Sequence, residues 1–457
     1  MPVRSTRCRL AAVWLAALGG ALGCTSRDRA SDTPRRPNVV IVLTDDQGYA
    51  DVGVFGAEGF TTPNLDRIAS EGIKLTNLYV AAPICSPSRA ALMTGSYPVR
   101  VGITDVLEPA STTGLNPAEE TIAELLKSVG YATAAIGKWH LGDDPTFLPT
   151  RQGFDEYFGL PYSNDMTPLP LLDGEEVVEQ SPDLSQITRR YTARAVDFIE
   201  KNRESPFFLY LAHTMPHVPL AASDDFRGMS ERGLYGDVIM EIDWSVGQIL
   251  ETLEGLGLAD DTLLVFTSDN GPWLTYGNHA GSAAPLREGK WTTFEGGQRV
   301  PGVARWPHRI PAQAISNEIV TTMDLFPTLA AITGAALPPQ PIDGKNVLPL
   351  LEGAAGAVSP TELLYFYLYD ELQAVRRGPW KLHLPHSYET VVMPGSDGAR
   401  GEDEQRDIPL SLFDLDADPG ETTDLSAEHA DVVSELTSAA SAFDADLKAN
   451  ARPAGQL

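Results

Sequence analysis

The sequence is poor in cysteine, in basic residues and in long apolar runs. Its 457 residues include three cysteines, and 34 basic residues stand against 62 acidic ones, giving a net charge of −28 at pH 7. Beyond the N-terminus there is no run of about 20 apolar residues, the length needed to cross a bilayer. We therefore expect no nucleic-acid partner, because phosphate binding needs basic surface, and no membrane span in the body of the chain. At about 150 residues per domain, the length predicts two or three domains.

The N-terminus has the pattern of an export signal. Three arginines in the first nine residues precede an apolar stretch at residues 10–22, which is short for a membrane span. Residues 21–24 (ALGC) resemble a bacterial lipoprotein cleavage site, in which the cysteine becomes the lipidated first residue. We predict a lipoprotein signal peptide over 1–23, a tether over 24–36, and a location on the periplasmic face of a membrane. The alternative is an ordinary secretory signal that is cleaved nearby.

Signal cleavage also decides the state of the cysteines. It removes Cys8 together with three arginines and no acidic residue, so the net charge changes from −28 to −31. Lipid on Cys24 leaves Cys85 as the single thiol. An exported protein with one thiol has no internal disulfide.

Alternating strands and helices predict an α/β fold. Residues 38–44 (NVVIVLT) are continuously apolar, as in a strand buried on both faces of a parallel sheet. Further strands are expected at 131–136, 207–212 and 262–267, between helices at 116–129, 188–202 and 237–256. This order predicts a large, mostly parallel central sheet flanked by helices, over residues 37–350.

A smaller α+β domain is expected over residues 351–457. It begins with a linker of small residues at 351–361. Short strands are predicted at 363–369, 374–375 and 380–383, followed by an irregular acidic stretch at 395–408 and a helix at 427–448.

Four polar clusters each follow a predicted strand. They are Asp45 with Asp46, Lys138 with His140, His213 with His217, and Asp269 with Asn270. Open α/β sheets bind ligands at the carboxyl ends of their strands, so the four clusters predict one site. Among them, Asp45, Asp46, Asp269 and Asn270 offer only oxygen ligands, which suit a hard divalent cation such as Ca²⁺ or Mg²⁺.

Cys85 belongs to a segment suited to anions. Pro87 and Ser88 can begin a helix, which places Cys85 just before the helix N-terminus, where exposed N–H groups and the helix dipole favour negative charge. Arg89 adds a fixed cation one turn later. A thiolate, however, is a poor ligand for a hard metal.

This segment resembles a known signature. Residues 85–89 (CSPSR) are similar to the C-x-P-S-R motif of the type I, formylglycine-dependent sulfatases, which belong to the alkaline phosphatase superfamily. Five further segments resemble the same family in the same order: 90–95 (AALMTG), 137–142 (GKWHLG), 268–271 (SDNG), 289–297 (GKWTTFEGG) and 412–421 (LFDLDADPGE). The resemblance covers about residues 37–448, and the arylsulfatase A-like group is the nearest.

The resemblance implies a sulfuric ester hydrolase, with residues 37–350 as its catalytic domain. A maturase of the family would convert Cys85 to formylglycine, whose hydrate has two hydroxyls. The metal, Ca²⁺ with Mg²⁺ as second choice, would be held by Asp45, Asp46, Asp269, Asn270 and modified Cys85. The catalytic set would be Cys85, Arg89, Lys138, His140, His217 and Lys290.

The implied roles differ from residue to residue. Arg89 and Lys138 would stabilise the nucleophile as an alkoxide, and Lys138 with Lys290 would neutralise sulfate oxygens. His217 would protonate the leaving alcohol, and His140 would later deprotonate the second hydroxyl so that sulfate departs.

The sequence does not identify the alcohol part of the substrate, and it leaves two alternative functions open. The substrate is expected to be a small carbohydrate or aryl sulfate, contacted by loops such as 105–115, 143–175 and 384–407. One alternative is a phosphonate or phosphate ester hydrolase of the same superfamily. The other is a lipid-anchored binding protein without catalysis.

Overall fold

The computed structural model describes residues 36–457, so the predicted signal peptide and almost all of the tether lie outside the described residues. Its centre is an 11-stranded sheet in which the strands run in the order β11-β2-β10-β9-β1-β8-β4-β5-β6-β7, with β12 paired to β2. The strands are β1 (Asn38–Thr44), β2 (Ile73–Tyr79), β4 (Ala132–Gly137), β5 (Glu156–Gly159), β6 (Pro170–Asp173), β7 (Glu176–Gln180), β8 (Phe207–Ala212), β9 (Thr262–Ser268), β10 (Arg299–Arg305), β11 (Ala314–Ser316) and β12 (Val320–Thr321).

The five strands in the middle of the sheet are parallel. β1 pairs in parallel with β8 and β9, and β4 pairs in parallel with β8 and β5. Antiparallel pairs occur where β10 joins β9 and β2, and where β6 joins β5 and β7. The predicted fold class, a large and mostly parallel sheet with helices, is confirmed.

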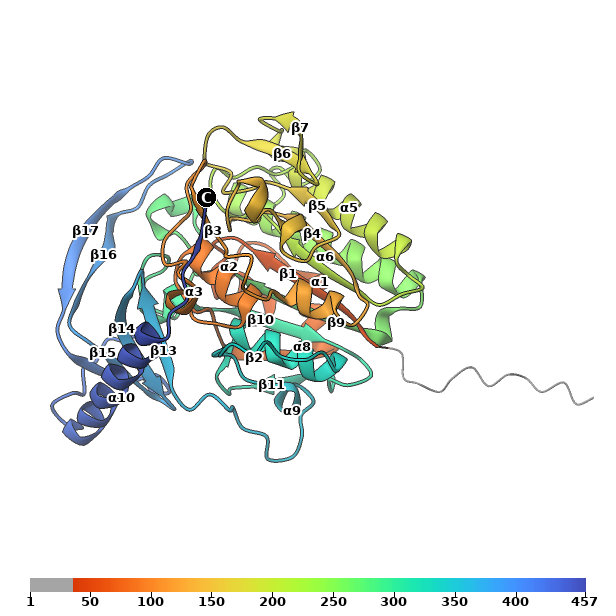
Figure 1. The fold of residues 1–457 in the computed structure, drawn as a ribbon. Helices are drawn as coiled ribbons and strands as arrows, with labels where there is room; N and C mark the ends of the chain where they lie inside the picture. Colours follow the sequence, from red (N-terminus) through yellow and green to blue (C-terminus); the bar gives the residue numbers. More distant parts are fainter. Residues whose placement is uncertain (1–35) are drawn as a thin grey trace, which may run out of the picture. The chain divides into compact units, whose positions relative to one another are not determined.

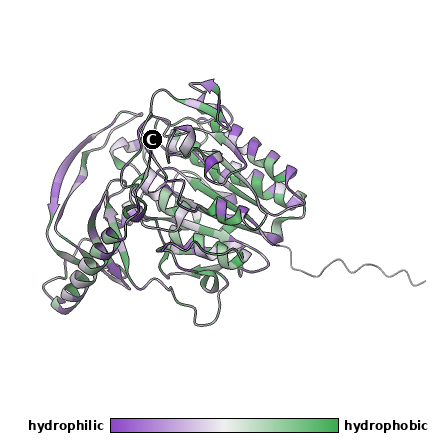
Figure 2. Cartoon of the chain, viewed as in Figure 1, coloured by the Kyte–Doolittle hydropathy of each residue, from purple (hydrophilic) through white to green (hydrophobic). Residues whose placement is uncertain are grey.

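Helices cover both faces of this sheet (Figure 1). Val39, Ile41 and Leu43 of β1 face a core shared with α2 (Cys85–Thr94), α4 (Ile122–Lys127), α8 (Leu325–Thr333) and α9 (Leu348–Leu351). Val40 and Val42 face the opposite core, built with α1 (Pro63–Ser70), α5 (Ile187–Lys201) and α6 (Leu234–Gly255). Side chains alternate along a strand, so burial on both faces explains why β1 is apolar at every interior position. Figure 2 shows the same pattern, with hydrophobic strands inside and hydrophilic residues on the outer helices.

The C-terminal region forms smaller antiparallel sheets and one long helix. β13 (Leu364–Leu368), β14 (Glu371–Arg377), β15 (Trp380–His383) and β18 (Ser411–Asp414) make a four-stranded sheet, against which α10 (Ala430–Ala449) packs. A separate hairpin pairs β16 (His386–Met393) with β17 (Glu402–Ile408), and it curves along the left of Figure 1. The chain ends at β19 (Gly455–Gln456), which pairs with β3 (Thr113–Gly114) of the N-terminal part.

Three local predictions were wrong. The helix predicted from residue 116 begins at Ile122, because Thr121 and Glu124 form a capping box that fixes the N-terminus there. α2 includes Cys85, because extended Ile84 is the N-cap and its carbonyl accepts the first helical hydrogen bond from Ser88 N at 3.1 Å. The acidic stretch predicted to be irregular contains β17, a strand held by pairing with β16 and not by burial.

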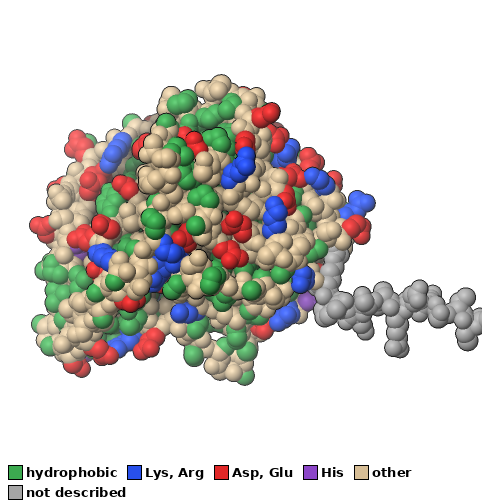
Figure 3. All heavy atoms as spheres, viewed as in Figure 1, with side chains coloured by type: hydrophobic (Ala, Val, Ile, Leu, Met, Phe, Trp, Pro, Cys, Tyr) green, Lys and Arg blue, Asp and Glu red, His purple; other side chains and the backbone are tan. Residues whose placement is uncertain are grey.

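The face of the molecule drawn in Figure 3 has no basic patch, and the described residues form no helix that could cross a membrane. Acidic and basic side chains are interspersed over the face in Figure 3. Between residues 36 and 457, no helix has the length and apolarity required to cross a bilayer.

Candidate active site

The four predicted clusters lie at one edge of the sheet. β9, β1, β8 and β4 are neighbours and run in parallel, so their carboxyl ends meet. Asp45 follows β1, Lys138 follows β4, His213 follows β8 and Asp269 follows β9. Asp45, Lys138, His217 and Asp269 come together here, whereas His213 does not join them.

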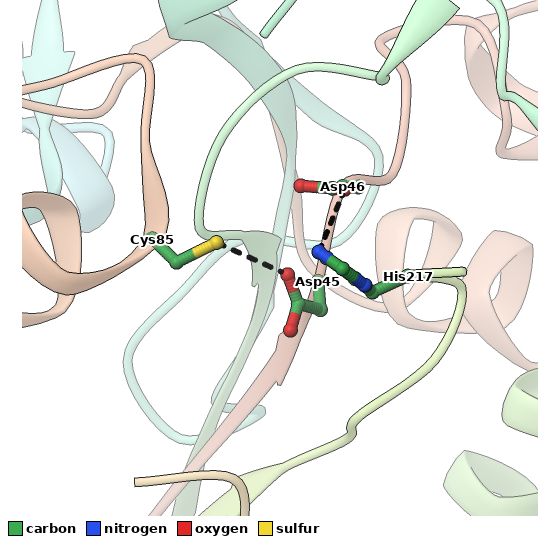
Figure 4. Close-up of side chains that lie close together, drawn as sticks. All are labelled: Asp45, Asp46, Cys85 and His217. Carbon is green, nitrogen blue, oxygen red and sulfur yellow. Dashed lines mark hydrogen bonds and ion pairs between the residues drawn. The ribbon is translucent and has the colours of Figure 1, made fainter. Parts of the chain in front are cut away.

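Four side chains at this edge form a buried group that could hold a metal. The ligand atoms of Asp45, Asp46, Cys85 and His217 all lie within 4.8 Å of one another (Figure 4). The Cys85 thiol donates to Asp45 Oδ1 at 3.5 Å, and His217 Nε2 lies 3.6 Å from Asp46 Oδ2. Cys85 is the first residue of α2, whereas the other three residues lie in segments that follow strands.

Asp269 and Asn270 adjoin this group through Asp46. Asp269 Oδ1 accepts from the backbone N–H of Asp46 at 3.2 Å, and Asn270 Nδ2 donates to Asp46 Oδ1 at 2.7 Å. Asp46 has a φ of 65°, in the left-handed region that aspartate tolerates better than most residues. This conformation directs two consecutive carboxylates, Asp45 and Asp46, to the same site, although neighbours on a strand would point to opposite faces.

Three buried cations face the carboxylates. Arg89 donates through Nε to Asp269 Oδ2 at 2.9 Å, and its Nη2 lies 3.4 Å from Asp45 Oδ2. Lys138 Nζ pairs with Asp45 Oδ2. Lys290 Nζ donates to Asp46 Oδ1 at 2.7 Å and to Cys85 Sγ at 3.3 Å.

These charges shift the pKa values of the site in different directions. Burial raises the pKa of Asp45, but Lys138, His217 and Arg89 outweigh it, so the pKa lies well below its usual range. Burial and the Asp45 charge raise the pKa of Asp269 to about 6. Burial also raises the pKa of the Cys85 thiol well above its ordinary value, despite Lys138 and Lys290 nearby. An unmodified thiol here is therefore protonated and a weak nucleophile.

The donor set fits a hard divalent cation. Asn270 Oδ1 is buried and has no hydrogen-bond partner among the described residues, although its Nδ2 has two. A buried amide oxygen without a donor is costly, and a cation removes that cost. Together with the carboxylates of Asp45, Asp46 and Asp269, it offers the oxygen ligands that Ca²⁺ and Mg²⁺ take. Lys138 and Lys290 hold two of these carboxylates here, so a bound cation would compete with them.

The histidines of the site are buried and differ in their partners. Burial and Lys138 hold the pKa of His140 well below its usual value, and burial and Lys290 lower the pKa of His217. His140 Nε2 lies 3.2 Å from the Leu107 carbonyl, while its Nδ1 has no partner in the described part of the chain. His217 Nδ1 lies 2.6 Å from the Val218 carbonyl, which leaves Nε2 facing the carboxylates.

His213 lies apart from this group. Its Nε2 is 3.3 Å from Ser245 Oγ on α6, and burial lowers its pKa to about 3. It therefore stays neutral, and its position after β8 did not make it a member of the cluster.

Comparisons with known proteins agree with this geometry. A family model described as "Sulfatase" matches residues 37–335, and one described as "C-terminal region of aryl-sulfatase" matches residues 359–455. The chain belongs to the sulfatase family. The sulfatase is thus a sulfuric ester hydrolase.

Two relatives and one solved structure show how far the similarity extends. Human arylsulfatase A is 40% identical over 429 residues, covering 86% of this chain and 83% of that protein. Human N-acetylgalactosamine-6-sulfatase is 39% identical over 452 residues, covering 90% of this chain and 86% of that protein. The crystal structure of the PsFucS1 sulfatase from Pseudoalteromonas sp. superposes with a TM-score of 0.81 at 28% identity, covering 92% of each chain.

Two residues of the sulfatase site were missed in the sequence. Ser163 Oγ lies 3.1 Å from Lys138 Nζ and 3.3 Å from His217 Nε2, so it links the two side chains. Trp273 lies beneath Lys290, with Nζ 4.6 Å from its ring centroid. Ser163 follows a short strand and no local pattern marks it, whereas Trp273 could have been suspected from its place two residues after the 268–271 motif.

Proposed function

We propose that this protein is an exported, lipid-anchored sulfatase that removes sulfate from carbohydrate esters, using formylglycine made from Cys85 and a bound Ca²⁺. The observation that carries the chemistry is the environment of Cys85. Cys85 is 2% exposed, its sulfur lies beside Lys290 and Asp45, and burial raises the pKa of its thiol. A protonated thiol among oxygen ligands for a hard cation suits neither metal binding nor attack.

A modified residue 85 and a bound cation would complete the site. Formylglycine, made from Cys85 by a maturase, would supply an oxygen nucleophile in place of the thiol. Asp45, Asp46, Asp269 and Asn270 would hold Ca²⁺, which would supply fixed positive charge to offset the charge of the sulfate.

The chain's own cations would hold the sulfate group. Lys290 and Lys138 carry their ammonium groups at the site, and Arg89 is fixed by Asp269 and by the Lys138 carbonyl at 2.8 Å. Because these side chains are buried and already held in place, they need little rearrangement as charge grows on the sulfate oxygens. Metal binding to Asp45 and Asp46 would free both lysines for this task.

The two histidines would move the protons. The Val218 carbonyl holds Nδ1–H of His217, so Nε2 can carry a second proton toward the leaving oxygen, and its lowered pKa makes that proton acidic. The Leu107 carbonyl accepts a hydrogen bond from Nε2–H of His140. Nδ1, which has no partner among the described residues, then carries a lone pair that can accept a proton from residue 85.

The carbohydrate substrate is supported by one relative. N-acetylgalactosamine-6-sulfatase is named for a sulfated sugar and matches nearly the whole of this chain. The chemistry is tested by mass spectrometry of the peptide with residue 85, and by rates on 4-nitrophenyl sulfate, an aryl phosphonate and a sulfated sugar library. An aldehyde mass with preference for sulfates is expected. Full activity with an intact Cys85 thiol, or preference for the phosphonate, would contradict the proposal.

The lipid anchor rests on the N-terminal sequence alone. Cys24 follows small residues at the end of the apolar stretch. Lipid on this residue, as more than one acyl chain, would hold the protein stably on a membrane. Cys24→Ser should release the protein into the soluble fraction, and equal membrane binding of this variant would refute the anchor.

A further inference from the structure

A pocket of about 500 Å³ lies beside the catalytic residues, within the size range of ligand sites. One part of its lining is aromatic, with Trp273, Trp291 and Tyr369. The other part is polar and comes from the β16–β17 hairpin and its tip, with Glu389, Arg400 and Gln405. The polar residues belong to the loop 384–407 that the sequence assigned to the leaving group, whereas the aromatic residues were not foreseen.

The aromatic part adjoins the group that would hold sulfate. The Trp273 ring lies 4.6 Å from Lys290 Nζ and has its centroid 5.5 Å from that of His217. Trp291 directly follows Lys290 and packs against the apolar cluster that contains Ile84, the neighbour of Cys85. A leaving group attached to a sulfate at Lys290 would therefore meet these two rings first.

Two of the aromatic residues have a backbone conformation that bulky residues avoid. Trp291 has a φ of 71° and Tyr369 a φ of 56°, and their ring centroids lie 6.2 Å apart. Tyr369 begins the two-residue turn between β13 and β14, since Leu368 pairs with Glu371, and glycine, asparagine or aspartate normally occupies such a position. Residues in such sparsely populated conformations cluster at functional sites, and exposed Gln313 shows that they also occur elsewhere.

The polar part is also fixed in place. The backbone N–H groups of Gly395 and Gly401, at the hairpin tip, both donate to the Thr275 carbonyl at 2.9 Å. Asp403 accepts from Thr275 Oγ1 at 3.1 Å and from Arg400 at 2.9 Å. Arg400 uses one of its five N–H donors in this way, and its guanidinium carbon lies 6.0 Å from the Trp273 ring centroid.

We propose that this pocket binds a pyranose ring of a saccharide leaving group, stacked on Trp291 and Tyr369 with its hydroxyls toward Glu389, Arg400 and Gln405. A sugar ring has an apolar face of C–H groups and a polar rim, so it matches both parts of the lining. A flat aryl group would use the aromatic part alone. The inference rests on the proposed carbohydrate sulfatase function and assigns the residues that select the sugar.

Binding can be separated from catalysis in a Cys85→Ala protein loaded with Ca²⁺, which lacks the nucleophile. Calorimetry would give the Kd of a library of sulfated mono- and disaccharides, of 4-nitrophenyl sulfate and of inorganic sulfate, in this background with and without further substitutions. Tyr369→Gly should weaken the best saccharide at least about 5-fold, because one stacking surface is lost, while Tyr369→Phe retains its affinity. Gln405→Ala should weaken that saccharide more than 4-nitrophenyl sulfate.

Replacing Tyr369 by glycine also relieves backbone strain, and Gln313→Gly is the control for that effect. Gln313 is exposed, has a φ of 59° and lies outside the pocket lining, so its variant should keep the Kd of every ligand. Glycine suits the backbone at Tyr369 as well, so the melting temperature of Tyr369→Gly should be unchanged or higher.

Three outcomes would overturn the inference: unchanged saccharide affinity in Tyr369→Gly, equal losses of saccharide and 4-nitrophenyl sulfate in Gln405→Ala, or no saccharide bound more tightly than inorganic sulfate. Failure of the proposed function looks different. In that case the wild-type protein hydrolyses no sulfate ester, while the Kd values still report on the pocket.

Discussion

Lys381 should be the lysine whose removal most weakens the contact between the catalytic sheet and the C-terminal sheet. It lies on β15 with no exposed side-chain surface, 3.0 Å from Glu295 Oε1 and 3.0 Å from Glu421 Oε1, both equally buried. It also donates to the Thr293 carbonyl at 2.8 Å. Thr293 and Glu295 belong to the 289–297 segment that carries Lys290, so this contact holds a segment of the active site.

The size of the effect follows from the burial. Lys381→Met removes the cation that the buried carboxylates of Glu295 and Glu421 share. Breaking a buried ion pair on one side destabilises a protein by about 3–5 kcal/mol. At about 2 °C per kcal/mol, the low end for large domains, the melting temperature should fall by about 6–10 °C. The double variant Lys381→Met/Glu421→Gln should recover at least about 1 kcal/mol of the lost free energy of unfolding, because one of the two unpaired buried charges is removed.

An exposed lysine provides the matched control. Lys448 pairs with Asp444 at 3.0 Å on α10, with 44% of its side chain exposed, and Lys448→Met should change the free energy of unfolding by less than about 0.5 kcal/mol. Urea unfolding of the metal-loaded protein measures both variants. A loss below about 1 kcal/mol for Lys381→Met would refute the argument from burial.

The pH dependence gives an independent check. Burial raises the pKa of Glu295, but Lys381, Arg376 and Arg299 outweigh it and hold the pKa at about 2. The Glu295 charge therefore stabilises the folded protein above about pH 4.5, and this contribution is lost as the pH falls toward 2. Without Lys381, the carboxylate of Glu295 protonates at higher pH, so the deficit of Lys381→Met should be smaller at pH 5 than at pH 8.

Three further predictions concern the reaction. Cys85→Ser should trap a covalent sulfate ester, because serine has one hydroxyl and cannot re-form an aldehyde, and mass spectrometry that finds repeated turnover without an adduct would contradict this. His217→Ala should lower rates most for substrates with poor leaving groups, by about 10²–10⁴-fold, whereas His140→Ala should accumulate sulfated enzyme; equal losses across leaving groups in a rate series would refute this division. Chelation should abolish activity and weaken inorganic sulfate binding at least about 10-fold in calorimetry, with recovery on adding Ca²⁺; full activity after chelation, or stoichiometric zinc in the protein, would exclude the predicted metal.

The sequence predicted the sheet and its functional edge because both depend on local pattern. β1 is apolar at every interior position, and its predicted and observed bounds are the same. Polar residues follow four of the five central parallel strands, β1, β4, β8 and β9. Parallel strands bring their carboxyl ends together whatever the spacing between them in the chain. The residues of the candidate metal site could therefore be grouped before any distance was known.

What the sequence could not predict depends on contacts between distant segments. The turn residue Tyr369 and the hairpin β16–β17 come close to the candidate catalytic residues because of how the C-terminal region folds. No local sequence pattern predicts this tertiary contact. The strand β17 is polar on nearly every position, so its pairing with β16 leaves no hydrophobic alternation to detect. The 116–129 error had a different cause, since a good N-cap at Asn116 competed with a complete capping box at Thr121.

The charge balance of the site explains how so acidic a chain can take an anionic substrate. Asp45, Asp46 and Asp269 face three buried cations, Arg89, Lys138 and Lys290, so without a metal the site pairs its own charges. A divalent cation held by these carboxylates would add two positive charges and compete with Lys138 and Lys290 for them, which would leave the lysines unpaired in a low-dielectric environment. Their attraction for a sulfate monoanion then acts at short range and is little screened, while the −28 of the whole chain is spread over a surface where salt screens it. Metal binding and substrate binding are therefore expected to be coupled through the same three carboxylates, and neither the net charge nor the motif alone would have indicated this.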